Sequence, residues 1–475
     1  MGDGSRRKPH LLSCVCLLTL ASLLPRASDA EESGVKAFSP QARLVAAYYF
    51  NWYIDGATHK NSHWRLYPDP ATNPVTWSWE PCYPKGKERG ARIFGLDDSK
   101  KWPGGRLPDT SKWPDSDDWL FQIAEMRSAK WAGLDFVFVD IWPLSDFQNG
   151  HPELVRRGLA ARDGRPTPEL TALFKAWRWL DRRGEKPVKL SMFVDTPGLG
   201  ADIDLRNPDG LDALWKPVRD FHKQFFGDGG YRARMPASSV AAMAGNDRRP
   251  RPVFVIFFPR MPGGEWVAQW DAASFTELRA RFRRTFGLDP YICVNQHLHG
   301  PKYGGWNGVQ KDGTIVDISR KAGVVDNEWP WFASLQGPLI RDDSIVISPG
   351  MWNRSGGHKI PGGATLEDGS PVYLGAYRYS SEEAKVSRYE RDWLQVLSYP
   401  SNLKHRLLVI ETWNELIEGT GVSPARPVVR RTADGKFIDR WGDSPTQYLE
   451  LTRKYTAIWK KGQSASVGAR PAPKH

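Results

Sequence analysis

Cysteine is scarce in this sequence, which limits the cross-links and metal sites that it can form. Of the 4 cysteines among its 475 residues, two lie within residues 1–30. The other two, Cys82 and Cys293, have no ligand partner at zinc-finger spacing. Separation along the chain does not fix the distance between their Cα atoms, so a disulfide between them stays open. The pattern excludes a zinc finger.

Histidine is also sparse, with 10 in the chain. His297 and His299 form the only close pair, and on a strand they would share one face. That arrangement is compatible with a metal ion, but hydrogen bonding to a ligand in a cleft is the role that we expect. We therefore expect no cofactor and no metal site.

Long apolar runs are absent after residues 11–24. No later stretch approaches the roughly 18 to 20 apolar residues that a membrane-spanning helix requires. Basic residues 6–8 precede the apolar run and small residues 28–30 follow it, which is the layout of a secretory signal peptide over residues 1–30. A lipoprotein anchor is the alternative, although the run continues past the cysteines within it. We expect a secreted or periplasmic protein with no membrane span.

Basic residues outnumber acidic ones, 66 against 54, which gives a formal net charge of +12. Such an excess could attract acidic polymers. The densest basic runs, residues 248–251 and 279–284, carry no helix-turn-helix, zinc-finger or RNA-binding motif, so we expect no nucleic-acid partner. The 22 Trp, 20 Phe and 15 Tyr instead suit a carbohydrate substrate, because aromatic rings pack against sugars. We expect the protein to act as a monomer.

Apolar strand-length runs alternate with amphipathic helical stretches along the chain. The strands are expected at residues 44–50, 134–141, 188–194, 253–258, 291–294, 322–325, 344–348 and 407–411. Eight such units predict an α/β fold, a (β/α)8 TIM barrel with long inserted loops on its C-terminal face. We expect one domain over residues 31–463 and a disordered tail over residues 464–475. The Trp-rich loop 65–114 should cover the C-terminal face and bring at least one Trp to the cleft.

In a TIM barrel the active site forms where the strands end. That rule collects acids, amides and aromatic residues, as a carbohydrate site requires: Asn51, Trp52, Asp140, Trp142, Asp195, Asn295, His297, Asp326, Glu328, Trp352, Arg354, Trp413, Asn414, Glu415 and Glu418. We expect Glu415 and Glu418 to be catalytic. The expected substrate-binding residues are Asn51, Trp52, Asp140, Trp142, His297, Glu328, Trp352, Arg354, Trp413 and Asn414.

The acids around the last strand carry most of this hypothesis. Apolar residues 407–410 lead into Glu411, Glu415 and Glu418, in a segment that glycines mark as a loop. Crowded carboxylates repel one another, so at least one should have a raised pKa, as a general acid needs near neutral pH. A solvated surface loop is the plainer alternative. The rival acid pair is Asp326 with Glu328.

Residues 414–420 read Asn-Glu-Leu-Ile-Glu-Gly-Thr. They resemble the Asn-Glu-x-x-Glu-Gly-Thr motif of glycoside hydrolase family 99, the endo-α-mannosidases and endo-α-mannanases, and of the related family 71. Residues 48–53 and 63–64 resemble the end of that family's first strand. The resemblance implies a retaining, endo-acting hydrolase of α-linked mannose-type glycans. It implies that Glu415 assists the 2-hydroxyl of the substrate and that Glu418 is the acid/base.

Leu416 and Ile417 stand where family 99 members usually carry Trp followed by Gly or His. Two alternatives therefore stay open: a non-catalytic carbohydrate-binding protein on a barrel scaffold, and a metal-assisted carbohydrate-active enzyme. A barrel alone does not decide among them, because the fold supports many chemistries.

Overall fold

The computed structural model describes most of the barrel and part of its loops. The described residues are 34–51, 82–88, 90–110, 113–141, 168–199, 203–227, 232–258, 270–297, 308–309, 315–316, 325–331, 338–341, 344–350, 387–399, 405–415, 420–425, 429–431, 437–440 and 444–462. The expected signal peptide and C-terminal tail lie outside them. None of the described helices is long and apolar enough to cross a membrane.

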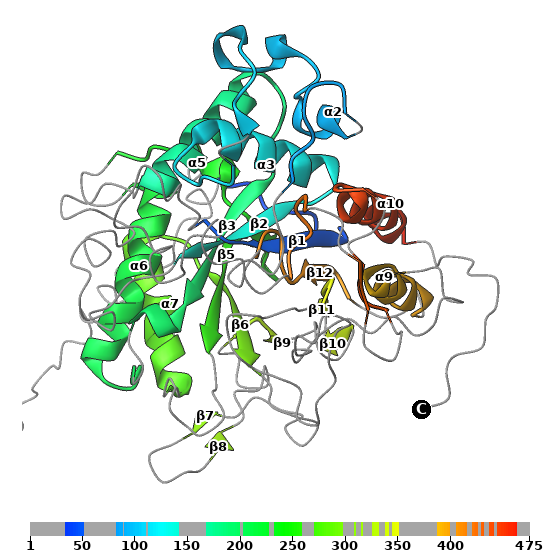
Figure 1. The fold of residues 1–475 in the computed structure, drawn as a ribbon. Helices are drawn as coiled ribbons and strands as arrows, with labels where there is room; N and C mark the ends of the chain where they lie inside the picture. Colours follow the sequence, from blue (N-terminus) through cyan, green and yellow to red (C-terminus); the bar gives the residue numbers. More distant parts are fainter. Residues whose placement is uncertain are drawn as a thin grey trace, which may run out of the picture.

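Eight parallel strands curl into a barrel (Figure 1). In spatial order they are β11 (Ser344–Ile347), β12 (Leu407–Ile410), β1 (Leu44–Tyr49), β2 (Phe136–Ile141), β3 (Lys189–Asp195), β5 (Pro250–Phe258), β6 (Tyr291–His297) and β9 (Asn327–Trp331). The expected contact between the first and last strands is confirmed, since β1 pairs with β12 in parallel from Leu44↔Leu407 to Ala47↔Ile410. The structure is a (β/α)8 barrel, as the alternation predicted.

The barrel is almost closed. β9 and β11 lie next to each other, and the Ser344 hydroxyl on β11 donates to Asn327 Oδ1 on β9 at 3.2 Å. The backbone ladder of the described strands does not continue across this junction, which we call the seam. Every other neighbouring pair of the eight strands shares a ladder.

Smaller strands decorate the barrel and were not expected from the sequence. β10 (Leu339–Arg341) runs antiparallel to β11, and β4 (Ala242–Ala244) runs antiparallel to the start of β5. Two further antiparallel pairs are formed by β7 (Gly308–Val309) with β8 (Ile315–Val316) and by β13 (Val429–Arg431) with β14 (Phe437–Arg440).

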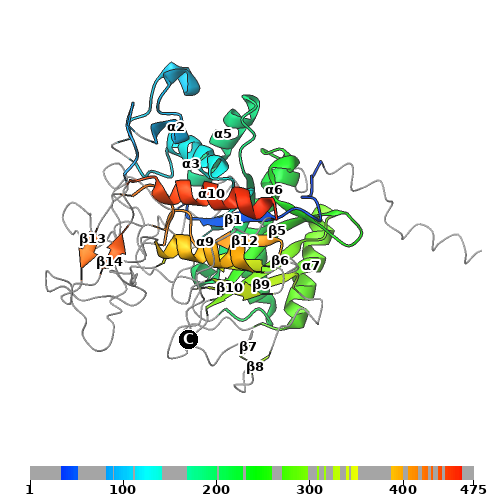
Figure 2. The same cartoon turned by 90° about the vertical axis from the view of Figure 1, so that its right-hand side faces the viewer.

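Helices form the outer layer. The described ones are α2 (Ala91–Phe94), α3 (Trp119–Trp131), α5 (Pro168–Arg182), α6 (Pro208–Phe226), α7 (Ala272–Phe286), α9 (Arg388–Ser398) and α10 (Gln447–Lys460). Single turns of 3-10 helix lie at η2 (Ser99–Lys101), η3 (Pro103–Gly105), η5 (Thr196–Leu199) and η6 (Ala237–Ser239). Figure 2 shows α9 and α10 side by side over β1 and β12.

Side chains that alternate along each strand divide the core into two parts. Inward positions fill the barrel with large rings, among them Tyr48, Phe138, Phe193 and Trp329. Outward positions such as Val137 pack against the helices. The barrel interior is therefore filled rather than hollow, and a ligand can meet the sheet only at an end of the strands.

The described part of the 65–114 loop packs against α3. Trp102 and Trp113 are buried there, and Trp113 Nε1 donates to Asp118, the residue that caps α3. These two rings lie in the outer layer. Trp77 and Trp79 fall outside the described residues, so the idea that this loop supplies a cleft tryptophan stays a prediction for them.

Candidate active site

Polar side chains gather at the C-terminal end of the barrel. Asp140 and Asp195 take inward positions near the ends of β2 and β3, and Asn295 does so on β6. Glu411 directly follows β12 and continues its inward face, two residues after Val409. All four side chains are buried. Strand topology thus brings together acids and an amide that are far apart in sequence.

The floor beneath these groups is aromatic. Tyr48 packs edge-on against Phe193, with ring centroids 4.8 Å apart, and lies 5.5 Å from Phe138. Its hydroxyl accepts hydrogen bonds from Asn295 Nδ2 at 2.6 Å and from the indole N–H of Trp329. Burial raises the pKa of Tyr48 well above its usual range, so the hydroxyl is neutral. This weakly polar floor strengthens the interactions among the charges above it.

Asp140 is a buried carboxyl group whose ionisation is opposed by its surroundings. Its side chain is 6% exposed, and neither carboxylate oxygen has a hydrogen-bond partner among the described residues. Burial raises its pKa well above the usual range, and the negative charges of Asp195 and Glu415 raise it further. Three carboxyl groups therefore share one confined region and hold at least one proton at a pH where exposed acids have lost theirs.

Glu415 is fixed by the turn that follows β12. We call this the site turn: residues 411–415 and 420–425. Glu415 is 3% exposed, and its N–H donates to Thr412 Oγ1 at 3.0 Å. Its carbonyl accepts from the Thr420 and Gly421 amides at 3.1 and 3.3 Å. Because both backbone groups of Glu415 are bonded within the turn, the position from which its side chain extends is fixed. We call the region of Asp140, Asp195 and Glu415 the acidic mouth.

Trp413 and Asn414 anchor the site turn to the barrel. Asn414 Oδ1 accepts from the Phe50 amide at 2.7 Å, and its Nδ2 donates to the Phe50 carbonyl at 2.9 Å. The Trp413 ring is fully buried, and its Nε1 donates to Glu125 of α3 at 2.8 Å. The sugar-stacking and hydroxyl-binding roles that we expected for them do not match these positions. Both side chains are used up in holding the turn.

Asp326 and Glu328, the rival acid pair, do not follow the end of a strand as we expected. We expected a strand to end before Asp326, whereas β9 begins after it, at Asn327. Asp326 therefore lies at the opposite end of the barrel, where it pairs with Arg251 and Arg279. Glu328 is the second residue of β9, not a residue beyond its end, and alternation with the inward Trp329 directs it to the outer face.

The remaining expected residues divide into two groups. Asn51 follows β1 and is buried, with its Oδ1 accepting from Gln122 Nε2 of α3 at 2.8 Å. His297 is the last residue of β6, but its side chain is outside the described part. The expected residues that fall outside the described ranges are Trp52, Trp142, Trp352, Arg354 and Glu418.

Sequence reasoning missed Tyr48 and Glu125. Nothing in an uninterrupted apolar run marks Tyr48 as the centre of a polar network. Glu125 did leave a signal, because it lies four residues after Phe121 and four before Ala129, on the buried stripe of α3. An acid on such a stripe must find hydrogen-bond donors.

The described residues contain neither a group of side chains arranged to hold a metal ion nor a disulfide. No group of three or more His, Cys, Asp or Glu side chains there is arranged to hold a metal ion. Cys82 and Cys293 are not joined in a disulfide. The open question about a disulfide between these two is thereby answered in the negative.

Fold and site together define a (β/α)8-barrel protein with an acidic mouth at its C-terminal face. The chain belongs to the family described as Domain of unknown function (DUF5010), whose model matches residues 110–469. A comparison with curated proteins found no match.

Several solved structures are similar to this chain. One is the GH99 endo-alpha-mannosidase from Bacteroides thetaiotaomicron in complex with BIS-TRIS-propane, at 12% identity and a TM-score of 0.46, covering 89% of this chain and 98% of that one. A second structure of the GH99 enzyme from that organism gives 13% identity, the same coverage and a TM-score of 0.41. A glycoside hydrolase-like protein gives 12% identity and a TM-score of 0.40, covering 90% and 99%.

Proposed function

We propose that the protein is a secreted glycoside hydrolase that uses Glu415 and Glu418, with α-linked mannose-type glycans as the first substrates to test. The observation that carries the proposal is the position of Glu415, buried at the mouth beside Asp140 and Asp195. Glycoside hydrolysis needs one carboxyl group that delivers a proton to the leaving oxygen and another that acts as base or nucleophile. A mouth that gathers carboxyl groups and raises a pKa suits that requirement.

The roles of the two glutamates are those implied by the resemblance of residues 414–420 to the motif of glycoside hydrolase family 99. Glu415 would take the proton of the substrate's 2-hydroxyl, so that this oxygen attacks the anomeric carbon, and Glu418 would act first as acid and then as base. Asp195, on the neighbouring wall, offers oxygen acceptors for sugar hydroxyls. Protonated Asp140 can donate a hydrogen bond as well as accept one.

The test is a hydrolysis assay of the purified protein on α-mannans, xylans and other glycans. Glu415→Gln and Glu418→Gln keep side-chain shape but remove proton transfer, which general acid–base catalysis values at about 10²- to 10⁴-fold. We expect both variants to lose that factor or more in kcat. Glu277→Gln, an exposed change on α7, should leave kcat unchanged.

Two results would contradict the proposal in different ways. Undiminished hydrolysis by both glutamine variants would show that other acids do the chemistry. No hydrolysis by the wild type across the panel, with glycan binding retained, would favour the carbohydrate-binding protein that Leu416 and Ile417 leave open.

A further inference from the structure

Glu125 is a fully buried carboxylate behind the site turn. It belongs to α3, in the layer between that helix and the barrel. Its Oε2 accepts from Trp413 Nε1 at 2.8 Å, and its Oε1 accepts from the Tyr83 hydroxyl at 3.2 Å. No Lys or Arg in the described part of the chain forms an ion pair with it. Burying an acid in this way costs free energy, so its two donors must offset the loss of water.

The backbone of Trp413 bonds the two arms of the site turn to each other and to the barrel. Its N–H donates to the Tyr48 carbonyl of β1 at 2.7 Å. Its carbonyl accepts from the amides of Val422 and Ser423, both at 2.8 Å. The indole bonded to Glu125 is therefore attached to the residue that joins both arms of the turn, two positions before Glu415.

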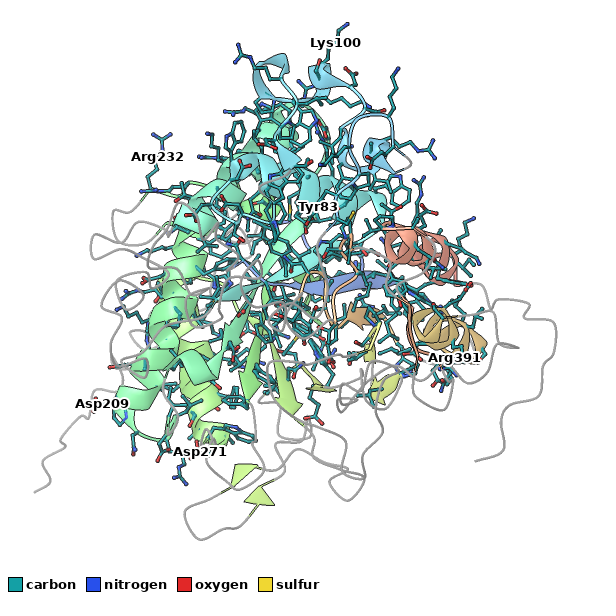
Figure 3. The ribbon with its side chains drawn as sticks, in the orientation of Figure 1. Tyr83, Lys100, Asp209, Arg232, Asp271 and Arg391 are labelled. Atoms are coloured by element: carbon teal, nitrogen blue, oxygen red, sulfur yellow. The ribbon has the colours of Figure 1, made fainter. Side chains whose placement is uncertain are left out.

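A second contact reaches the far arm of the turn from the same place. The Cys82 amide donates to the Pro424 carbonyl at 3.1 Å, and the next residue is Tyr83, the other donor to Glu125. The Tyr83 ring packs edge-on against Trp113 and Phe121, with centroids 5.3 and 5.9 Å away. Figure 3 labels Tyr83, which lies beside the α3 layer. One carboxylate thus links α3, the 82–88 segment and the site turn.

We propose that Glu125 is a positioning residue for Glu415: its carboxyl group accepts the hydrogen bond of the Trp413 indole and so holds the site turn against the barrel. The effect on the turn follows from the contacts alone, while any effect on turnover rests on the proposed hydrolase function. A charged acceptor binds a donor about twice as strongly as a neutral one, so the hydrogen bonds from Trp413 and Tyr83 offset part of the cost of ionising Glu125 in its buried position.

The exchange protection of the site turn should depend on pH, because Glu125 ionises in the neutral range. Burial raises the pKa of Glu125 to about 7, although the hydrogen bonds from Trp413 and Tyr83 lower it. The titratable groups that face it are Tyr83 and, from β1, Tyr49, whose own pKa burial raises well above its usual range. Burial is the larger effect, so an open turn that exposes Glu125 to water binds its proton less tightly than the closed turn does. As pH rises from about 5 to 7, ionisation of Glu125 therefore favours the open state, and the site turn should become less protected.

Hydrogen exchange of the backbone amides in the site turn tests this without any assay of activity. Trp413→Phe removes only the indole donor, and Glu125→Ala removes the acceptor. We expect each to speed exchange in the turn about tenfold, as loss of a hydrogen bond to a charged group implies. Met126→Leu, a volume-conserving change at the next buried position of α3, should leave exchange there unchanged. Unchanged exchange in both test variants would overturn the proposal.

Glu125→Gln separates charge from shape, because glutamine keeps an oxygen for the Trp413 indole but does not ionise. Exchange in wild type, corrected for its intrinsic pH dependence, should become faster between pH 5 and about 7, whereas the glutamine variant should show no such change. The same pH dependence in both proteins would mean that Glu125 does not control the turn.

Kinetics then connect the turn to Glu415 on whichever glycan the wild type hydrolyses. We expect Trp413→Phe and Glu125→Ala to lower kcat with little change in KM, since a displaced catalytic group costs rate rather than binding. A loosened turn with unchanged kcat would overturn the positioning of Glu415. A loosened turn in a chain that hydrolyses nothing would instead contradict the proposed function and leave the role of Glu125 in the turn supported.

Discussion

Asp140 opposes folding at the position it occupies. Its pKa in the folded protein is raised by burial and by its acidic neighbours Asp195 and Glu415, so the native state keeps a proton that the unfolded chain releases near pH 4. The unfolded state therefore binds fewer protons above that pH, and stability falls as pH rises. Such strain is common where a site must work on a ligand.

Asp140→Asn should relieve this strain. We expect the free energy of unfolding at pH 7 to rise by about 1 to 2 kcal/mol, and the gain to disappear near pH 4, where the wild-type group is protonated in both states. Urea unfolding at the two pH values measures the difference. Asp181→Asn, on the exposed face of α5, serves as the control and should change neither value. An equal gain at both pH values would show that charge is not the cause.

At the scale of elements, the site turn depends on one close approach of backbone to backbone. A Cβ on Gly421 would lie 3.1 Å from three main-chain atoms: the Asn414 Cα, the Glu415 nitrogen and the Trp413 oxygen. These atoms belong to the segment that carries Glu415, so they cannot yield without moving it.

Gly421→Ala should therefore displace the turn. We expect a loss of about 1 to 3 kcal/mol in the free energy of unfolding, the usual cost of overpacking. Glycan hydrolysis, if the proposed function holds, should fall by a larger factor than this stability loss accounts for. Ser423→Ala, in the same turn, adds no atoms and is the matched control in thermal unfolding. If the two variants unfold at the same temperature, Gly421 is not required for packing.

How well each element could be predicted depends on how local its cause is. The bounds of α7 have local causes, because the Asp271–Ser274 capping box begins the helix and Gly287, at φ 70°, ends it. β9 was misplaced because it begins with two polar residues, Asn327 and Glu328, and the partner of the inward Asn327 is Ser344 of another strand. The mouth acids followed from the barrel rule, whereas Glu125 depends on a partner 288 positions away.

At the scale of the whole molecule, the two ends of the barrel have different tasks. The N-terminal end is tied by an ion cluster in which Asp326 pairs with Arg251 at 2.6 Å and with Arg279, and also accepts from the Ile292 amide at 2.9 Å. Arg279 is 8% exposed at its side chain and Asp326 14%. This cluster joins β5, α7, β6 and β9 far from the acidic mouth.

Asp326→Asn should weaken the fold and leave the mouth intact. Each of two largely buried guanidinium groups would lose one counter-charge and keep Asp289, which lies 2.9 Å from Arg251 and 3.6 Å from Arg279. We expect a cost of about 1.5 to 3 kcal/mol, as for the loss of hydrogen bonds to a charged group. Urea unfolding measures the loss, and exchange protection of the site turn should persist in the folded variant. Asp212→Asn, in an exposed pair with Arg281, should cost no more than about 1 kcal/mol. Equal losses from the two variants would contradict the division of tasks.

The seam between β9 and β11 gives the barrel a property that a fully laddered cylinder lacks. Backbone ladders join the eight strands one after another from β11 round to β9. At the seam, the wall is held by side chains such as Ser344 and Asn327. Because β11 pairs with the short antiparallel β10 on this edge, the described strands form a rolled sheet whose two margins are β10 and β9, and no backbone ladder joins those margins. β12, which leads into the site turn, pairs directly with β11, so any widening at the seam would act on the side of the barrel that carries Glu415.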